Sequence, residues 1–236
     1  MIKLYYDGDS FAGMLPAGQT QHTGIYLAQD MEMELWDYSF PGKNPQKIIR
    51  NSMRWSFEQP NSFMVIGIGC NDRLEQFTDD VQQIEENIDY LNRGGMAKCR
   101  FETENSVGVL QNTDFKCKEH IDLFHWQYLE TTTLFGLIAL HDYLLYNNIK
   151  FIIHNLGGSF MIEHEQNKTS FSAGIDKQIR ARPRILNFYE NSMHEILQKN
   201  NCMPWDYADW GWWGHADETG HRVYADYLLE NIEKYE

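Results

Sequence analysis

Residues 63 to 72 read FMVIGIGCND, a continuous apolar run that ends abruptly in polar residues. The run does not alternate apolar and polar positions, so it fits a strand that is covered on both faces, as strands of parallel sheets are. The exit Gly69-Cys70-Asn71-Asp72 then lies at the carboxyl end of that strand, where open α/β sheets bind their ligands. The sequence therefore predicts a parallel sheet with a polar site at this strand end.

The first strand ends in a similar way. Ile2 to Tyr6 is a short apolar and aromatic run, and the cluster Asp7-Gly8-Asp9-Ser10 that follows is typical of a strand end. Asp and Ser are also favoured helix caps, because their side-chain oxygens accept hydrogen bonds from backbone N–H groups. Taken alone, the cluster predicts only a turn and a helix cap.

Strands alternate with helices along the rest of the chain. Further strands are expected at 31–40, near a sheet edge, and at 149–153. Helices are expected at 46–55, at 121–146 and close to the C-terminus. Their apolar stripes comprise Ile49 and Met53, then Leu134, Leu137, Ile138, His141 and Leu145, then Ala225, Leu228, Leu229 and Ile232. This order predicts a three-layer α/β/α sandwich with a mostly parallel, flavodoxin-like central sheet.

We expect a single domain over residues 1–236 with two interruptions. Residues 73–119 are polar and weakly periodic, which favours a lid or specificity loop that contains a short helix near 76–91. A loop insertion is expected at 156–184. Its stretch 168–184 is locally basic, with Lys177, Arg180, Arg182 and Arg184. They predict either a solvated loop or a binding rim for an anionic substrate group.

The chain has 34 acidic and 20 basic side chains, which gives a formal charge of −14. This charge disfavours nucleic acid and anionic membranes as partners, and no stretch approaches the roughly 18 to 20 apolar residues of a membrane-spanning helix. No signal peptide is recognisable, so we expect a cytoplasmic protein, or one that a phage encodes or a virion carries.

Cys70, Cys99, Cys117 and Cys202 show no paired spacing, which predicts reduced thiols and no metal site.

Four polar elements are expected to converge at the carboxyl edge of the sheet. They are the strand exits at 8–10, 41–42 and 69–72, and the stretch 213–221 that precedes and begins the last helix. Acyl transfer needs a nucleophile, a base that takes its proton, and donors aimed at the oxyanion. The Ser10 hydroxyl fits the nucleophile and the His215 imidazole fits the base. The backbone N–H groups of Ser10 and Gly42 and the side-chain amide of Asn71 fit the donors. Glycine at position 42 lets the backbone approach the substrate oxygen with no Cβ in the way.

The ordered set of motifs resembles the SGNH (GDSL-type) hydrolase superfamily. The set comprises Gly8-Asp9-Ser10, the lone Gly42, Gly69-Cys70-Asn71-Asp72 and the stretch HADETGHRVYADYL at 215–228, and the resemblance covers nearly the whole chain. It implies a serine esterase that acts through a covalent acyl-enzyme and needs no metal or organic cofactor. It also implies that Ser10 is the nucleophile, that His215 is the general base, and that Ser10, Gly42 and Asn71 form the oxyanion hole.

One departure from the family concerns the acid that orients the histidine. The family usually has an Asp three residues before the catalytic His, and Trp212 stands there in this chain. Asp209 or Asp206 on a longer loop, a backbone carbonyl in a Ser-His dyad, or a catalytically weak site are the alternatives, and Asp209 is preferred over Asp206. His221, at the start of the last helix, is expected to have a structural role.

Four tryptophans, Trp205, Trp210, Trp212 and Trp213, precede His215. Packing explains them most simply, but indoles also stack on the apolar faces of sugars, so Trp212 and Trp213 are candidates for substrate binding. We therefore expect removal of a small acyl group, such as acetyl, from a carbohydrate or similar ester.

Two other functions compete with this one. The first is a catalytically weak SGNH-like module that binds glycan or serves as a structural component. The second, a flavodoxin-like nucleotide binder, is disfavoured because YDGDSFAG at 6–13 lacks the lysine and the glycine spacing of a P-loop. The oligomeric state is left open.

Overall fold

The structure of the chain is a computed structural model. It describes residues 2–40, 43–69, 73–77, 107–111, 126–157, 170–186, 188–202, 204–206 and 214–235. The strands are β1 (Lys3–Asp7), β2 (Glu34–Asp37), β3 (Phe63–Ile68), β4 (Arg73–Phe77), β5 (Val107–Gln111) and β6 (Lys150–Asn155). The helices are α1 (Ser10–Gly13), α2 (Thr23–Asp30), α3 (Pro45–Glu58), α6 (Trp126–Tyr146), α7 (Ser170–Arg180), α8 (Met193–Lys199) and α10 (Glu218–Ile232).

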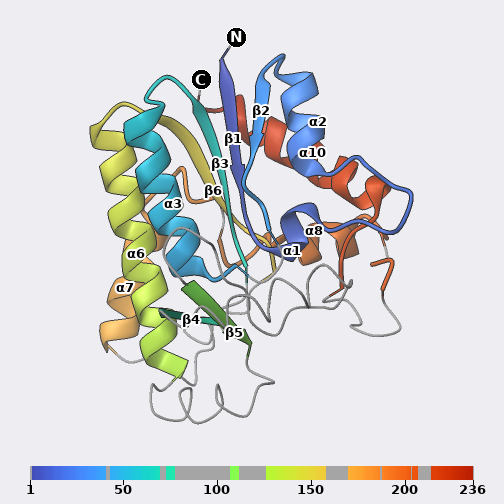
Figure 1. Cartoon of the computed structure of the whole chain (residues 1–236). Helices are drawn as coiled ribbons and strands as arrows, with labels where there is room; N and C mark the ends of the chain where they lie inside the picture. Colours follow the sequence, from blue (N-terminus) through green and yellow to red (C-terminus); the bar gives the residue numbers. More distant parts are fainter. Residues whose placement is uncertain are drawn as a thin grey trace.

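Four parallel strands form the central sheet in the order β2-β1-β3-β6 (Figure 1). In this register Leu4 of β1 lies opposite Leu35 of β2 and Phe63 of β3. The chain runs from β1 outward to the edge strand β2 and then crosses back to β3 on the other side of β1. The topological switch, where such sheets bind ligands, therefore lies between the carboxyl ends of β1 and β3. Strands β4 and β5 form a separate antiparallel pair.

Helices cover both faces of the sheet (Figure 1). Tyr5 packs in a core with residues of α3, α6 and α7, whereas its neighbour Tyr6 packs in a second core with residues of α1, α2, α8 and α10. Successive side chains of a strand point to opposite faces, so two adjacent tyrosines supply both cores. The predicted three-layer α/β/α sandwich with a parallel sheet is confirmed.

Several predicted elements agree with the structure. All six residues of β3 are buried, as the uninterrupted apolar run 63–68 predicts. Strand β2 lies at the sheet edge and contains only half-buried and exposed residues. In α10 the predicted residues Ala225, Leu228 and Ile232 are buried, and they pack on the core that contains Tyr6.

Two details of the helix-to-strand unit α6–β6 differ from the sequence prediction. Leu140 and Leu144 are fully buried, whereas Leu145 of the predicted stripe is 50% exposed. Helix α6 packs against both α3 and α7, so its buried face is wider than one stripe. Strand β6 continues through Asn155, which places His154 inside the strand and not after it.

The two predicted interruptions also contain regular structure. Strand β4 occupies residues 73–77, where the short helix near 76–91 was expected to begin, and the rest of that helix lies outside the described residues. Helix α7 occupies 170–180 of the predicted loop.

The basic side chains at 177–184 are neutralised in part by acidic neighbours. Arg180 Nε lies 2.9 Å from an oxygen of Asp176, and Arg182 Nη2 lies 2.6 Å from an oxygen of Asp142. This pairing argues against a binding rim for an anionic group.

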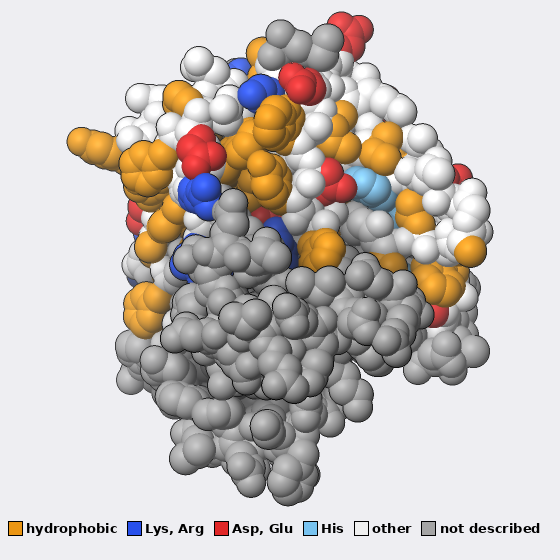
Figure 2. All heavy atoms as spheres, in the orientation of Figure 1, with side chains coloured by type: hydrophobic (Ala, Val, Ile, Leu, Met, Phe, Trp, Pro, Cys, Tyr) orange, Lys and Arg blue, Asp and Glu red, His pale blue; other side chains and the backbone are white. Residues whose placement is uncertain are grey.

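Hydrophobic side chains gather on the outer surface over α3 and α6, on the left of the molecule (Figure 2). Phe57 is 72% exposed and Tyr146 is 86% exposed. Both residues lie at helix ends that lead into the amino ends of β3 and β6, away from the strand exits. None of the helices in the described part of the chain is both long enough and apolar enough to cross a bilayer.

Two histidines are buried on the face of the sheet that α10 covers. His154 Nδ1 lies 2.8 Å from the Tyr224 hydroxyl, and His221 Nδ1 lies 2.9 Å from the Thr23 hydroxyl. Burial lowers the pKa of each imidazole to about 3, so both rings are neutral in the folded protein at pH 7. In the unfolded chain a histidine has a pKa near 6.5.

We predict that the free energy of unfolding falls as the pH is lowered from 7 to 5. In this range the unfolded chain binds protons that the folded protein does not, and each of the two histidines accounts for about 2 kcal/mol of the loss. Urea unfolding at both pH values measures the difference. His154→Gln and His221→Gln should each make it smaller by that amount, and an unchanged difference in both variants would contradict the prediction.

Candidate active site

The Gly8-Asp9-Ser10 turn places Ser10 at the carboxyl edge of the sheet. Asp9 is the N-cap of α1, and its carboxylate accepts a hydrogen bond from the Phe11 N–H at 3.0 Å. Gly69, at the exit of β3, leaves room for this carboxylate, because a Cβ at position 69 would lie 1.8 Å from an Asp9 oxygen. The helix-cap interpretation of the turn is therefore confirmed for Asp9, and Ser10 is the first residue of α1.

Asp206 binds His215 through both carboxylate oxygens. Oδ2 lies 2.5 Å from Nδ1 of the imidazole, and Oδ1 accepts the His215 backbone N–H at 2.6 Å. Both residues are buried, at 8% and 7% exposure. With Nδ1–H donated to the carboxylate, Nε2 is the nitrogen that is left to accept a proton. This Nε2 atom is buried and has no hydrogen-bond partner among the described residues.

The chain around His215 is held by further contacts. Trp205 N–H donates to the His215 carbonyl at 3.0 Å, and His194 Nε2 lies 3.1 Å from the Gly214 carbonyl. Glycine is required at position 214, because a Cβ there would lie 2.2 Å from Asp206 Oδ1. These contacts fix the backbone on both sides of the imidazole and so fix the direction of Nε2.

Phe11 connects the Ser10 element to the histidine. Its ring stacks on the His215 imidazole at a centroid distance of 5.0 Å and meets the His194 imidazole edge-on at 4.8 Å. Phe11 follows Ser10 directly in α1. The structure therefore brings together the Ser10 and His215 segments, although about 200 residues separate them in the sequence.

Five predicted site residues lie outside the described residues: Gly42, Asn71, Asp209, Trp212 and Trp213. The sequence preferred Asp209 as the orienting acid, whereas the carboxylate that contacts His215 in the described part of the chain is that of Asp206.

Of the four clustered tryptophans, Trp205 lies within the described residues, and it is next to His215. Trp205 is 41% exposed, and its ring centroid lies 6.1 Å from that of His215 at an interplanar angle of 31°. An exposed indole next to the imidazole provides a flat apolar surface for a substrate.

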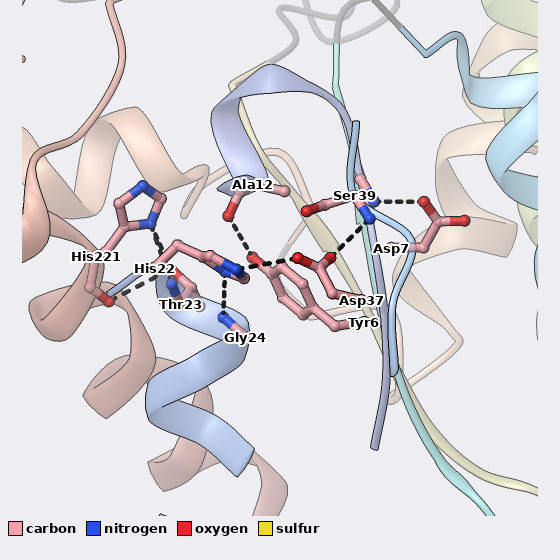
Figure 3. Close-up of polar contacts among 10 residues, drawn as sticks. Tyr6, Asp7, Ala12, His22, Thr23, Gly24, Asp37, Ser39 and His221 are labelled. Atoms are coloured by element: carbon pink, nitrogen blue, oxygen red, sulfur yellow. Dashed lines mark hydrogen bonds and ion pairs between the residues drawn. The ribbon is translucent and has the colours of Figure 1, made fainter. Parts of the chain in front are cut away.

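His221 has different neighbours, as Figure 3 shows. Its Nδ1 accepts the Thr23 N–H at 3.3 Å at the start of α2. The adjacent His22 caps α2 and lies 3.0 Å from Asp37 at the end of β2. His221 thus joins α10 to α2, in agreement with the predicted structural role.

In the described part of the chain, no group of three or more His, Cys, Asp or Glu side chains is placed to hold a metal ion. The arrangement offers a buried carboxylate–imidazole pair and a serine on an adjacent turn. These are the parts that general-base activation of a hydroxyl requires.

Comparison of the whole chain with known proteins identifies the fold. The psychrotrophic esterase EstA from Pseudoalteromonas sp. superposes with a TM-score of 0.52 at 12% identity, covering 100% of this chain and 98% of that chain. A protein described as lipolytic and of the G-D-S-L family, from Desulfitobacterium hafniense, has a TM-score of 0.49 at 12% identity, with coverages of 98% and 99%. The acetylxylan esterase Axe2 from Geobacillus stearothermophilus has a TM-score of 0.45 at 13% identity, with coverages of 98% and 94%.

No family model and no curated protein sequence matches the chain. At 12% identity, the likeness to EstA defines the fold and leaves the activity to be argued from the site. The chain has the fold of the SGNH (GDSL-type) hydrolases, as the motifs around Ser10 and His215 predict.

Proposed function

We propose that the protein is a serine ester hydrolase that acts through a covalent acyl-enzyme. Ser10 is the nucleophile, His215 is the general base and Asp206 is the acid that orients it. The Asp206–His215 pair is the observation that carries the proposal. It leaves a buried Nε2 without a partner among the described residues, and an unsatisfied buried polar atom of this kind calls for an explanation.

The proposed reaction has two steps. In the first, Ser10 Oγ attacks the ester carbonyl carbon and its proton passes to His215 Nε2. The bond to the alcohol then breaks, and the proton moves to the alcohol oxygen. In the second, His215 takes a proton from water and the hydroxide attacks the acyl carbon. The bond between that carbon and Ser10 Oγ then breaks, the proton on His215 passes to Ser10 Oγ, and the carboxylic acid leaves.

Asp206 and the oxyanion donors lower the energy of the charged intermediates. The Asp206 carboxylate keeps the proton of the neutral imidazole on Nδ1 and stabilises the imidazolium that forms. We assign the oxyanion hole to the backbone N–H groups of Ser10 and Gly42 and to the side-chain amide of Asn71, as the resemblance implies.

Covalent labelling with a fluorophosphonate tests this function. Wild-type protein should carry the adduct on Ser10, because an activated serine attacks phosphorus as it attacks a carbonyl carbon. Ser10→Ala should take no label, and His215→Ala should take far less. Peptide mass spectrometry locates the adduct, and a known serine hydrolase in the same tube is the control. A folded wild type that takes no label would contradict the proposal and favour the glycan-binding module.

We further propose that the substrate is a small acyl ester, such as an acetyl ester, of a carbohydrate. The exposed Trp205 indole beside His215 supports this class, since it can stack on the apolar face of a sugar ring. The net charge of −14 also favours a neutral substrate over an anionic one.

Replacement of the indole tests the substrate class. Trp205→Ala should raise KM for an acetylated disaccharide by about 3- to 10-fold, from a loss of ~0.5–1.5 kcal/mol of stacking, with little effect on p-nitrophenyl acetate. Phe57→Ala is the matched control, because Phe57 is an exposed aromatic residue at the opposite end of the sheet. Equal KM values for wild type and Trp205→Ala would rule out stacking on this residue.

A further inference from the structure

Asp7 and Lys43 form a buried ion pair beside the proposed active site. Lys43 Nζ lies 2.5 Å from Asp7 Oδ1, and the two side chains are 3% and 0% exposed. Lysine is almost never buried to this extent unless it is paired. Burial raises the pKa of the Asp7 carboxyl although Lys43 opposes this shift, which shows that the charged pair carries a desolvation cost.

Stability alone does not explain such a pair. Removing two charges from water costs several kcal/mol per ion, and apolar residues of similar volume often stabilise a fold equally well.

The contacts of the pair are specific. Asp7 Oδ1 also accepts the Gly8 N–H at 2.8 Å, and Oδ2 accepts the Tyr5 hydroxyl at 2.5 Å. Lys43 Nζ donates to the Tyr38 carbonyl at 2.5 Å. Both charges are thus hydrogen-bonded to neighbouring groups, which gives the pair a defined geometry.

The pair joins the end of β1 to the chain that follows β2. Along the same line, Phe40 N–H donates to the Gly8 carbonyl at 3.0 Å, and Lys43 N–H donates to the Phe40 carbonyl at 3.3 Å. Phe40 and Lys43, on either side of Pro41-Gly42, therefore both contact the turn that leads into Ser10. Asp7 precedes Ser10 by three residues, and Lys43 follows Gly42 directly.

We propose that Asp7 and Lys43 are a positioning pair, which holds the backbone on either side of Gly42 in register with the Ser10 turn. This role rests on the proposed function, in which Ser10 attacks and Gly42 donates to the oxyanion. Catalytic groups must be held within about 0.5 Å of their productive geometry, and a buried ion pair with fixed hydrogen bonds sets such a distance more sharply than an apolar contact. The pair therefore lowers the energy of the transition state, in which the oxyanion forms, and does not change the affinity for substrate.

The test replaces both charges at once. Asp7→Asn/Lys43→Met keeps an amide oxygen for the Gly8 N–H and fills the space of the lysine stem, so its Tm should stay near that of wild type. With p-nitrophenyl acetate, kcat should fall by about 10- to 100-fold, less than the ~10²- to 10³-fold loss on removal of an oxyanion donor, while KM stays within about 2-fold. This split between kcat and KM separates positioning from a purely structural role.

Two further variants keep the test decisive. Asp142→Asn/Arg182→Met neutralises an ion pair between α6 and the segment after α7, and it should leave kcat unchanged. Lys43→Arg retains the charge, but its wider head group cannot reproduce both short contacts, so kcat of the folded variant should fall by about 3- to 10-fold.

The outcomes separate this inference from the proposed function. A wild type that neither takes a fluorophosphonate nor hydrolyses the ester contradicts both. An active wild type whose folded Lys43 variants keep its kcat overturns the positioning role alone. Variants of Lys43 that raise KM by the factor expected for kcat, while kcat itself is preserved, would also overturn it.

Discussion

Asp206 holds His215 through two hydrogen bonds, one to the imidazole and one to the backbone of the same residue. The proposed chemistry depends on this contact, because it sets which nitrogen carries the proton and where the other nitrogen points. The contact in turn requires glycine at position 214, where any side chain would collide with the carboxylate. The glycine at position 214 thus allows the contact that fixes the orientation of the proposed base, His215.

The parallel sheet brings the other parts to the same place. The carboxyl ends of β1 and β3 lie side by side at the topological switch, and their exits carry Ser10 and Gly69. Asp9 caps α1 and occupies the space that Gly69 leaves open, so the Gly8-Asp9-Ser10 turn and the exit of β3 have complementary shapes. The buried Asp7–Lys43 pair then fastens the chain after β2 to this turn. The exits of β1, β2 and β3 are therefore held by contacts with one another.

The sequence predicted the layers of the fold because its signals are local. The apolar run 63–68 and the apolar stripe of α10 indicate which faces are buried, because buried positions are apolar and their spacing follows the period of the strand or helix. The register of α6 was less predictable, since Leu140 and Leu144 are buried through contacts with α3 and α7 that distant parts of the chain supply.

The site could be predicted only in part for the same reason. Ser10 and His215 lie in recognisable motifs, whereas Asp206 precedes His215 by nine residues and its contact depends on the path of the intervening chain. Spacing alone favoured Asp209, which is nearer to the usual family position. His194 and Lys43 gave no signal, because their roles come from contacts with the Gly214 carbonyl and with Asp7. The glycine at 214 was the available hint that a side chain approaches the backbone there.

The most direct test of the account compares kcat for p-nitrophenyl acetate in Asp206→Asn and Asp209→Asn. The amide at position 206 keeps the size of the side chain but cannot hold the imidazole proton on Nδ1. If His215 is the base, kcat should therefore fall by about four orders of magnitude, as it does when the triad Asp of a serine protease is replaced by Asn. Asp209→Asn should keep wild-type activity. The reverse result, with Asp206→Asn fully active and Asp209→Asn inactive, would contradict the assignment of the orienting acid and with it the geometry on which the proposed function rests.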